Sequence, residues 1–200
     1  MNYGVSVQNM MSLMASRIDS IAQQISSEEV DAFLQAILTA KRIYVMGAGR
    51  SGLVAKSFAM RLMHTGFTAY VVGETITPAV GPGDLIIGFS GSGNTKTIAD
   101  IAETAKSLGA EFALVSSNPE SRMGKLADYV IKIETQRDPV TCDAHEYEIR
   151  QMLGEHRSFA PLGTIFETTS LVFGDAAIST LMDMKKIEEV DLKRRHTNIA

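Results

Sequence analysis

The sequence predicts an α/β protein, with one domain built on a five-stranded parallel sheet that carries helices on both faces. Two observations lead to this prediction. Short runs of β-branched or apolar residues, typical of strands buried on both faces, alternate along the chain with segments of helical periodicity. The chain has 200 residues, a length that suits one domain with a single large core. Right-handed crossovers between such strands produce a three-layer sandwich.

Helices are expected before the first strand. Apolar residues recur at spacings of three and four from Val7 to Ile25, which predicts an amphipathic helix within residues 1–27. Ser27 is the expected N-cap of a second helix over residues 28–40, because two glutamates then lie in the first turn, where the helix dipole favours acids. The methionine-rich apolar face of the first helix is larger than one exposed helix should show, which indicates an assembly.

The alternation of strands and helices begins at residue 42. Helices are expected to separate the strands, with Gly66 and Gly109 ending the first two. Residues 134–161 are polar and aperiodic and indicate a long connection, with one helical turn around residues 146–153. Residues 185–200 form a basic tail, whose charges are typical of a solvated face. The predicted strands are residues 42–46, 68–72, 84–89, 111–115 and 129–133, and the helices are residues 53–64, 95–108, 121–127 and 162–184.

Composition excludes several classes of function. A net charge of −4 gives no electrostatic footprint for nucleic acid. The longest apolar runs have the length of strands, and residues 1–15 lack the features of a signal peptide, so we expect a cytoplasmic protein without membrane contact. Cys142 is the single cysteine, which excludes an internal disulfide and a thiolate-cluster metal site. His145 and His156 follow no recognised ligand spacing, and no metal is expected.

Two glycine- and serine-rich turns directly follow predicted strands. Residues 47–52 read Gly-Ala-Gly-Arg-Ser-Gly, and residues 90–95 read Ser-Gly-Ser-Gly-Asn-Thr. Each turn runs into a helix, so both offer backbone N–H groups and hydroxyls to an anion. Open parallel sheets bind ligands at the carboxyl ends of their strands, where these turns would lie. The candidate ligand contacts are Gly49, Arg50, Ser51, Ser90, Gly91, Ser92, Gly93, Asn94 and Thr95.

The identity of the anion follows from comparing three kinds of phosphate site. The first turn matches G-x-G-x-x-G, with Glu74 about twenty residues further on, but a dinucleotide would leave the second turn without a purpose. Gly88 and Gly93 have P-loop spacing, but Asn94 stands where the lysine is needed. A single phosphate monoester fits both turns better. The alternative is that residues 90–95 form only a tight turn, with Thr95 as an N-cap.

At this point the chain resembles a family. The second turn resembles the signature of the sugar isomerase (SIS) domain, and the run 47–64 is similar to that of the 6-phospho-3-hexuloisomerases. Val72-Gly-Glu74, Thr77-Pro78 and residues 118–121, 161–167 and 195–198 extend the resemblance over nearly the whole chain. The chain departs from the family pattern in residues 134–158 and at its end. The resemblance implies a flavodoxin-like or Rossmann-like SIS domain over residues 28–184, with residues 185–200 contributing to a neighbouring subunit's site.

The resemblance also implies an activity. It indicates an enzyme that interconverts D-arabino-3-hexulose 6-phosphate and D-fructose 6-phosphate through an enediol, in the ribulose monophosphate pathway of formaldehyde fixation. Such an enzyme binds a small sugar phosphate, needs no cofactor, and forms a homotetramer built from dimers. Two alternatives stay open: an isomerase of another sugar phosphate such as arabinose 5-phosphate, and a non-catalytic phosphosugar sensor.

Glu167 is the expected catalytic base. It lies in the first turn of a helix that follows Pro161-Leu-Gly163, with Thr164 as a possible cap. The alternative is an acid that only stabilises the helix dipole, but the resemblance implies a base at this position. His64 and His196 compete for the role of proton shuttle. His64 could instead stabilise a helix C-terminus, and His196 lies in the tail.

Overall fold

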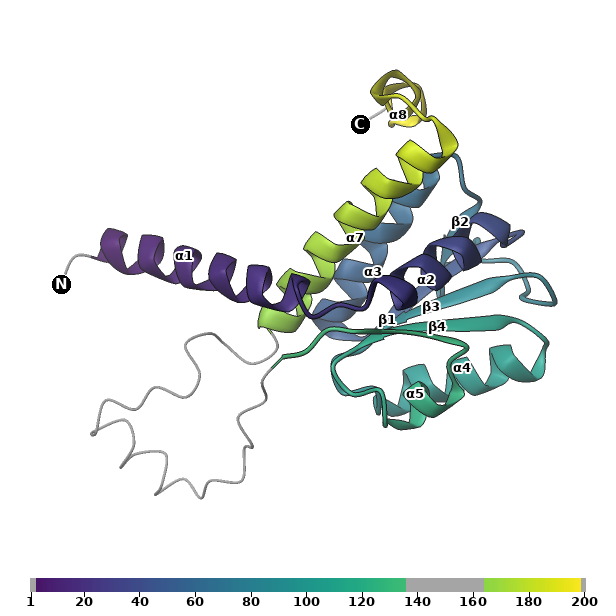
Figure 1. Cartoon of the computed structure of the whole chain (residues 1–200). Coiled ribbons are helices and arrows are strands. Elements are labelled where there is room, and N and C mark those ends of the chain that lie inside the picture. The colour runs from purple at the N-terminus through teal and green to yellow at the C-terminus, as the bar shows by residue number, and fades with distance from the viewer. Residues whose placement is uncertain (1–2, 136–163, 199–200) are drawn as a thin grey trace.

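The computed structural model describes residues 3–135 and 164–198 (Figure 1). The segment 136–163 falls outside these residues, and with it Cys142, His145, His156 and the helical turn expected at residues 146–153. The helices are α1 (Tyr3–Ala22), α2 (Ser27–Thr39), α3 (Gly49–His64), α4 (Lys96–Ser107), α5 (Arg122–Leu126), α7 (Thr164–Lys185) and α8 (Glu189–Arg195), and the strands are β1 (Ile43–Gly47), β2 (Ala69–Val71), β3 (Leu85–Phe89), β4 (Glu111–Ser116) and β5 (Tyr129–Lys132).

The five strands form one parallel sheet in the order β2-β1-β3-β4-β5, which confirms the predicted fold class. The central strand β3 is buried along its whole length, whereas the edge strand β2 is only half-buried. The order of the strands reverses between β1 and β3. In open α/β sheets such a reversal opens a crevice at the carboxyl ends of the two strands, where ligands bind.

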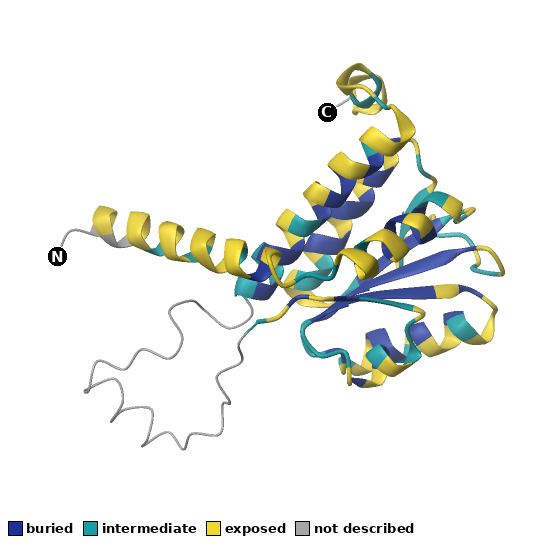
Figure 2. Cartoon of the chain, in the orientation of Figure 1, coloured by how far each residue is buried: buried dark blue, intermediate teal, exposed yellow. Residues whose placement is uncertain are grey.

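The two faces of the sheet build separate cores, because successive residues of a strand point to opposite faces. Ile43, Val45 and Ile87 pack with residues of α2, α3 and α7 on one face. Tyr44 and Ile86 pack with residues of α4 and α5 on the other face. Figure 2 shows the strands as the most deeply buried layer, with the outer surfaces of the helices exposed. The helices therefore cover both faces, as predicted.

Several boundaries differ from the prediction. The N-cap of α2 is Ser26 and not Ser27, and the Ser26 side chain accepts a hydrogen bond of 3.2 Å from the Glu29 N–H. Helix α3 begins at Gly49, four residues before the expected start, so the last four residues of the first glycine turn (49–52) are already helical. The basic tail, in which no helix was predicted, contains α8, which a capping box at Glu188 initiates. The predicted stops at Gly66 and Gly109 are confirmed by their positive φ of 88° and 86°.

Helix α1 projects away from the rest of the chain (Figures 1 and 2). Ile21, near its end, is buried, whereas Val7 and Met11 are 59% and 66% exposed. The helix is amphipathic as predicted, and it leaves apolar side chains on its outer half uncovered. None of the helices in the described ranges is both long and apolar enough to cross a membrane.

Candidate functional site

The two glycine-rich turns lie side by side at the carboxyl edge of the sheet. Gly47 at the end of β1 pairs in register with Phe89 at the end of β3. The first turn therefore begins at Gly47, beside Phe89, and the second turn begins at the next residue, Ser90. The structure thus brings both turns to the crevice where the strand order reverses, as the sequence predicts.

The first turn is closed by contacts that only glycine permits. A Cβ atom on Gly47 would lie 2.8 Å from the backbone of Ser51, and one on Gly52 would lie 2.8 Å from the Gly47 carbonyl oxygen. Gly49 has a φ of +56°, in the left-handed region. The N-cap of α3 is Ala48, whose side chain cannot cap the helix, so the first N–H groups of α3 remain available to an anion.

The dinucleotide interpretation of this turn finds no support at Glu74. This acid, which should contact a ribose, forms an ion pair of 2.6 Å with Lys56 on the surface. About half of each side chain is exposed.

In the second turn, serine hydroxyls shape the backbone. The Ser90 hydroxyl is buried and accepts a hydrogen bond of 3.2 Å from the Gly93 N–H, and the Ser92 hydroxyl accepts one of the same length from the Asn94 N–H. Each hydroxyl keeps its own proton to donate. Thr95 occupies the N-cap position of α4, as the alternative interpretation expected, but its side chain makes no capping hydrogen bond. The Thr95 hydroxyl is not committed to the helix.

The start of α5 and the residue before it, Ser121, support the second turn, which the sequence interpretation missed. The Asn94 side-chain oxygen accepts a hydrogen bond of 2.9 Å from the Arg122 N–H, and the Gly93 carbonyl accepts one of 3.1 Å from the Met123 N–H. A Cβ atom on Gly93 would overlap the Ser121 side chain. Asn94 and Gly93 therefore tie the turn to the start of α5 through hydrogen bonds, and Gly93 also packs closely against Ser121. The only signal for residues 118–121 in the sequence was the family resemblance.

The first turn of α7 lies against both glycine-rich turns. A Cβ atom on Gly91 would be 3.2 Å from the Phe166 ring, so α7 approaches the second turn as closely as glycine allows. The next residue, Glu167, faces the first turn, and its Oε2 lies 3.3 Å from Arg50 Nε. The structure thereby joins the expected base to the expected anion site. Glu167 lies in the first helical turn, as predicted, but the Thr164 hydroxyl makes no hydrogen bond in the described part of the chain.

Burial governs the proton affinity of Glu167. Its side chain is 14% exposed, and desolvation raises the pKa of its carboxyl above the usual value. The positive charge of Arg50 and the helix backbone lower the pKa and oppose that effect only in part. Oε2 has no hydrogen-bond partner among the described residues. A half-buried carboxylate with a raised pKa is suited to take a proton from a substrate at neutral pH.

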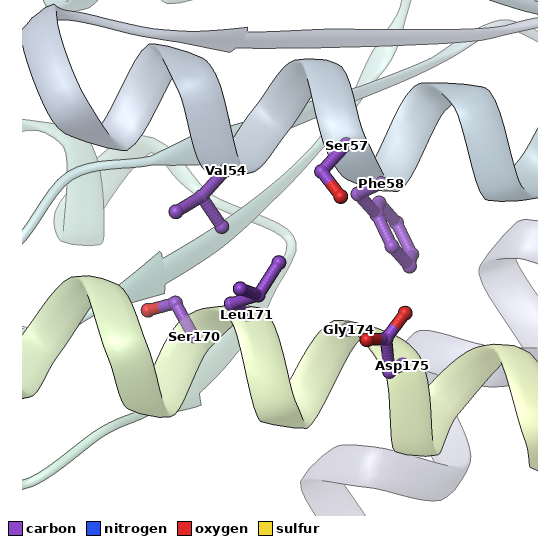
Figure 3. A pocket seen from close by; sticks show the side chains of 7 residues that line it. All are labelled: Val54, Ser57, Phe58, Ser170, Leu171, Gly174 and Asp175. Carbon is purple, nitrogen blue, oxygen red and sulfur yellow. The ribbon is translucent and has the colours of Figure 1, made fainter.

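Helices α3 and α7, which carry Arg50 and Glu167, pack directly against each other. In Figure 3, Val54 and Phe58 on α3 face Ser170, Leu171 and Gly174 on α7. A Cβ atom on Gly174 would lie 3.2 Å from the Phe58 ring, and the crevice has no room for a water molecule. This space is a helix contact rather than a ligand site.

A second hollow, of about 320 Å³, lies between α4 and the segment after β2. Its lining is mostly apolar, although Thr77, Asp100 and Thr104 are among the lining residues. It therefore suits neither a phosphate nor sugar hydroxyls.

The structure brings the two candidate histidines together but away from Glu167. The rings of His64 and His196 stack with centroids 5.1 Å apart, and Arg195 Nη1 donates to the His64 carbonyl at 3.3 Å. His64 ends α3, whereas Arg50 lies in its first turn, and a helix of 16 residues is about 24 Å long. Neither histidine can therefore reach Glu167 of its own chain.

His64 is buried at this end of α3, and burial lowers the pKa of its imidazole, helped by the charges of His196 and Arg61. The neutral ring is favoured. Within residues 3–135 and 164–198, no group of histidine, cysteine and acidic side chains is arranged to hold a metal ion.

Comparison with known proteins gives consistent matches over the chain. The model of the family described as "SIS domain" matches residues 36–144. An uncharacterized protein of Aeropyrum pernix is 45% identical over 94% of this chain and 90% of its own length. The 3-hexulose-6-phosphate isomerase of Bacillus subtilis is 42% identical over 92% of this chain and 94% of that enzyme. A crystal structure of a Methanococcus jannaschii protein, with an inferred function of 3-hexulose-6-phosphate isomerase, has a TM-score of 0.79 at 30% identity and covers 95% of this chain and 98% of its own.

Proposed function

The chain belongs to the SIS domain family and is closely related to 3-hexulose-6-phosphate isomerases, and on that premise we propose that it interconverts D-arabino-3-hexulose 6-phosphate and D-fructose 6-phosphate. The observation that carries this proposal is the position of the first turn of α7. That turn lies against both glycine-rich turns, through Glu167 beside Arg50 and Phe166 beside Gly91, and so supports a base next to a bound phosphate.

The substrate's phosphate binds in the anion site. Its proposed donors are the N–H groups at the start of α3 and the Thr95 hydroxyl at the start of α4, two helices that follow the neighbouring strands β1 and β3. Helix N-termini favour an anion through their unpaired amides and their dipoles. Ser51, Ser90 and Ser92 add hydroxyl donors. Binding at both turns holds the remote phosphate and leaves the carbons of the sugar to be oriented toward α7.

Glu167 then acts as the base. It removes the proton from carbon 2, next to the 3-ketone, and the electron pair forms the 2,3-enediol as the ketone oxygen takes a proton. Return of a proton to carbon 3, with loss of the hydroxyl proton at carbon 2, leaves the ketone at carbon 2. The raised pKa of Glu167 brings its proton affinity nearer to the working pH, where a general base is most effective.

The second proton transfer, between the two oxygens, is assigned to a histidine from another subunit. His64 and His196 lie at the far end of α3 from Glu167, so either can serve a site only across an interface. We propose a homotetramer built from dimers, in which residues 185–200 approach a neighbour's anion site. The uncovered apolar side chains of α1 support an assembly. Light scattering on the purified protein, with and without residues 1–27, tests this part.

The activity is tested by solvent exchange. Wild-type protein in deuterated water is mixed with 3-hexulose 6-phosphate, fructose 6-phosphate or arabinose 5-phosphate, and deuterium in the sugar is measured by mass spectrometry. We expect exchange with the first two sugars, and loss of at least about 1,000-fold in Glu167→Gln, since that substitution removes the base. Glu74→Gln is the matched control, because Glu74 is an exposed acid in a surface pair.

The other outcomes decide between functions. Exchange with arabinose 5-phosphate alone would assign the site to that sugar. Binding of all three sugars without any exchange would make the protein a sensor. Full exchange in Glu167→Gln would move the base elsewhere.

A further inference from the structure

Arg50 occupies a position that is unfavourable for a cation. It lies in the first turn of α3, where the helix dipole is positive and where acids, not bases, are stabilised. Its side chain is 56% exposed, so no packing requirement explains it. A residue that breaks a local rule in this way usually serves a function.

The contact that Arg50 makes is with Glu167. Arg50 Nε lies 3.3 Å from Glu167 Oε2. By comparison, Arg42 donates two hydrogen bonds of 2.9 and 2.7 Å to Asp84. The Arg50 pair lacks such a two-bond fork, so the guanidinium acts on Glu167 mainly through its charge. Its half-exposed position weakens that charge without cancelling it.

Glu167 depends on this charge. Burial raises the pKa of its carboxyl, and Arg50 is the charged side chain that lowers it. Oε2 receives no hydrogen bond from any described residue. Without Arg50 the carboxyl would therefore be protonated, and so inactive as a base, over a wider range of pH.

We propose that Arg50 is a positioning residue for Glu167 and not a ligand of the substrate's phosphate: its guanidinium keeps the carboxylate charged and directed at the anion site in the free enzyme. The role of Glu167 as a base is part of the proposed function, and this inference rests on it. The phosphate is held by the amides and hydroxyls of the two turns. Arg50 acts on the reaction through Glu167 alone.

The kinetic test compares Arg50→Met with Arg50→Lys, and uses Lys56→Met as the control. Lys56 is also a cation on α3, but it pairs with Glu74 on the surface. In Arg50→Met we expect kcat/KM to fall about tenfold at about pH 5.5 and to change less than about twofold at about pH 8. We expect KM itself to change less than about twofold. Arg50→Lys restores most of the pH profile, and Lys56→Met leaves it unchanged. A KM raised about tenfold at every pH, with the wild-type profile, would make Arg50 a phosphate ligand and overturn the proposal.

A second measurement does not need activity. The carboxyl carbon of Glu167 is followed by NMR in ¹³C-glutamate-labelled protein, and its signal is identified by its absence from Glu167→Gln. We expect this signal to titrate at a higher pH in Arg50→Met than in wild type, and at the wild-type pH in Lys56→Met. Titration at the same pH in Arg50→Met and wild type would refute the proposal, even if the protein proved not to be an isomerase. Conversely, a shifted titration in a protein without exchange activity would refute only the proposed function.

Discussion

Replacing Gly91 by alanine tests whether the approach of α7 to the second turn sets the position of the base. The added Cβ atom would lie 3.2 Å from two atoms of the Phe166 ring, so the ring must yield by a few tenths of an ångström. Gly91 has no positive φ, and alanine fits its backbone without strain. The effect of the substitution therefore comes from this contact. A displacement of 1 Å at an active site costs about 100-fold in rate, so a shift of a few tenths should cost about five- to tenfold in kcat.

The assay is the steady-state isomerisation of 3-hexulose 6-phosphate, with thermal unfolding measured in parallel. Crowding of this size destabilises by about 1 kcal/mol, or about 2 to 4 °C in Tm, which leaves the variant folded. Gly81→Ala is the control, because a Cβ atom there meets nothing within 4 Å. The double variant Gly91→Ala with Phe166→Leu should recover most of the activity. An unchanged kcat in Gly91→Ala would refute the claim that this contact positions Glu167.

Three further predictions follow from the structure. Thr95→Val should raise KM at least about tenfold, because it removes a charge-assisted hydrogen bond to the phosphate, and should leave Tm unchanged, because the side chain makes no capping hydrogen bond. An unchanged KM would mean that Thr95 has only a local structural role. Asp84→Asn should lower the free energy of unfolding by about 2 kcal/mol, because burial raises the pKa of Asp84 but the hydrogen bonds from Arg42 and the Gly81 N–H outweigh that effect and lower it. The stabilisation is present above the unfolded-state pKa and is lost as the pH falls through the lowered pKa of the folded state, which urea unfolding across a pH series would show. Burial lowers the pKa of His64, so protonation of its ring disfavours the buried state. Protection of residues 189–195 from hydrogen exchange should therefore fall as the pH drops below the unfolded-state pKa of about 6.5, and His64→Phe should abolish that dependence.

The fold could be predicted from the sequence because the hydrophobic periodicity and the helix-ending glycines agree. Buried strands such as residues 84–89 alternate with helices that end at Gly66 and Gly109, and only a parallel sheet with crossovers satisfies both signals. The position of the two turns at one edge follows from the same argument. The boundaries were harder to predict, since Ser26 and Ser27 are chemically equivalent as caps and only the backbone angles distinguish them.

The contacts between distant segments could not be predicted from the sequence. The ion pair between Arg50 and Glu167 joins residues more than 100 positions apart, and no local pattern encodes it. The hydrogen bond from the Arg122 N–H to the Asn94 side-chain oxygen joins residues 28 positions apart, and no local pattern shows which backbone N–H the asparagine meets. The helix in the tail was missed because the segment 189–195 is short and charged, and its start signal is a capping box formed by the acids Glu188 and Asp191.

The central claim is that Glu167 takes a proton from a carbon next to the carbonyl of a phosphosugar held at the two turns. The most direct measurement is the position of deuterium in fructose 6-phosphate after incubation with the protein in deuterated water, read by NMR. Because the reverse reaction must remove the proton at carbon 3 to form the 2,3-enediol, we predict deuterium at carbon 3 with wild-type protein and none with Glu167→Gln. Deuterium at carbon 1, or at carbon 3 in both proteins, would contradict the account.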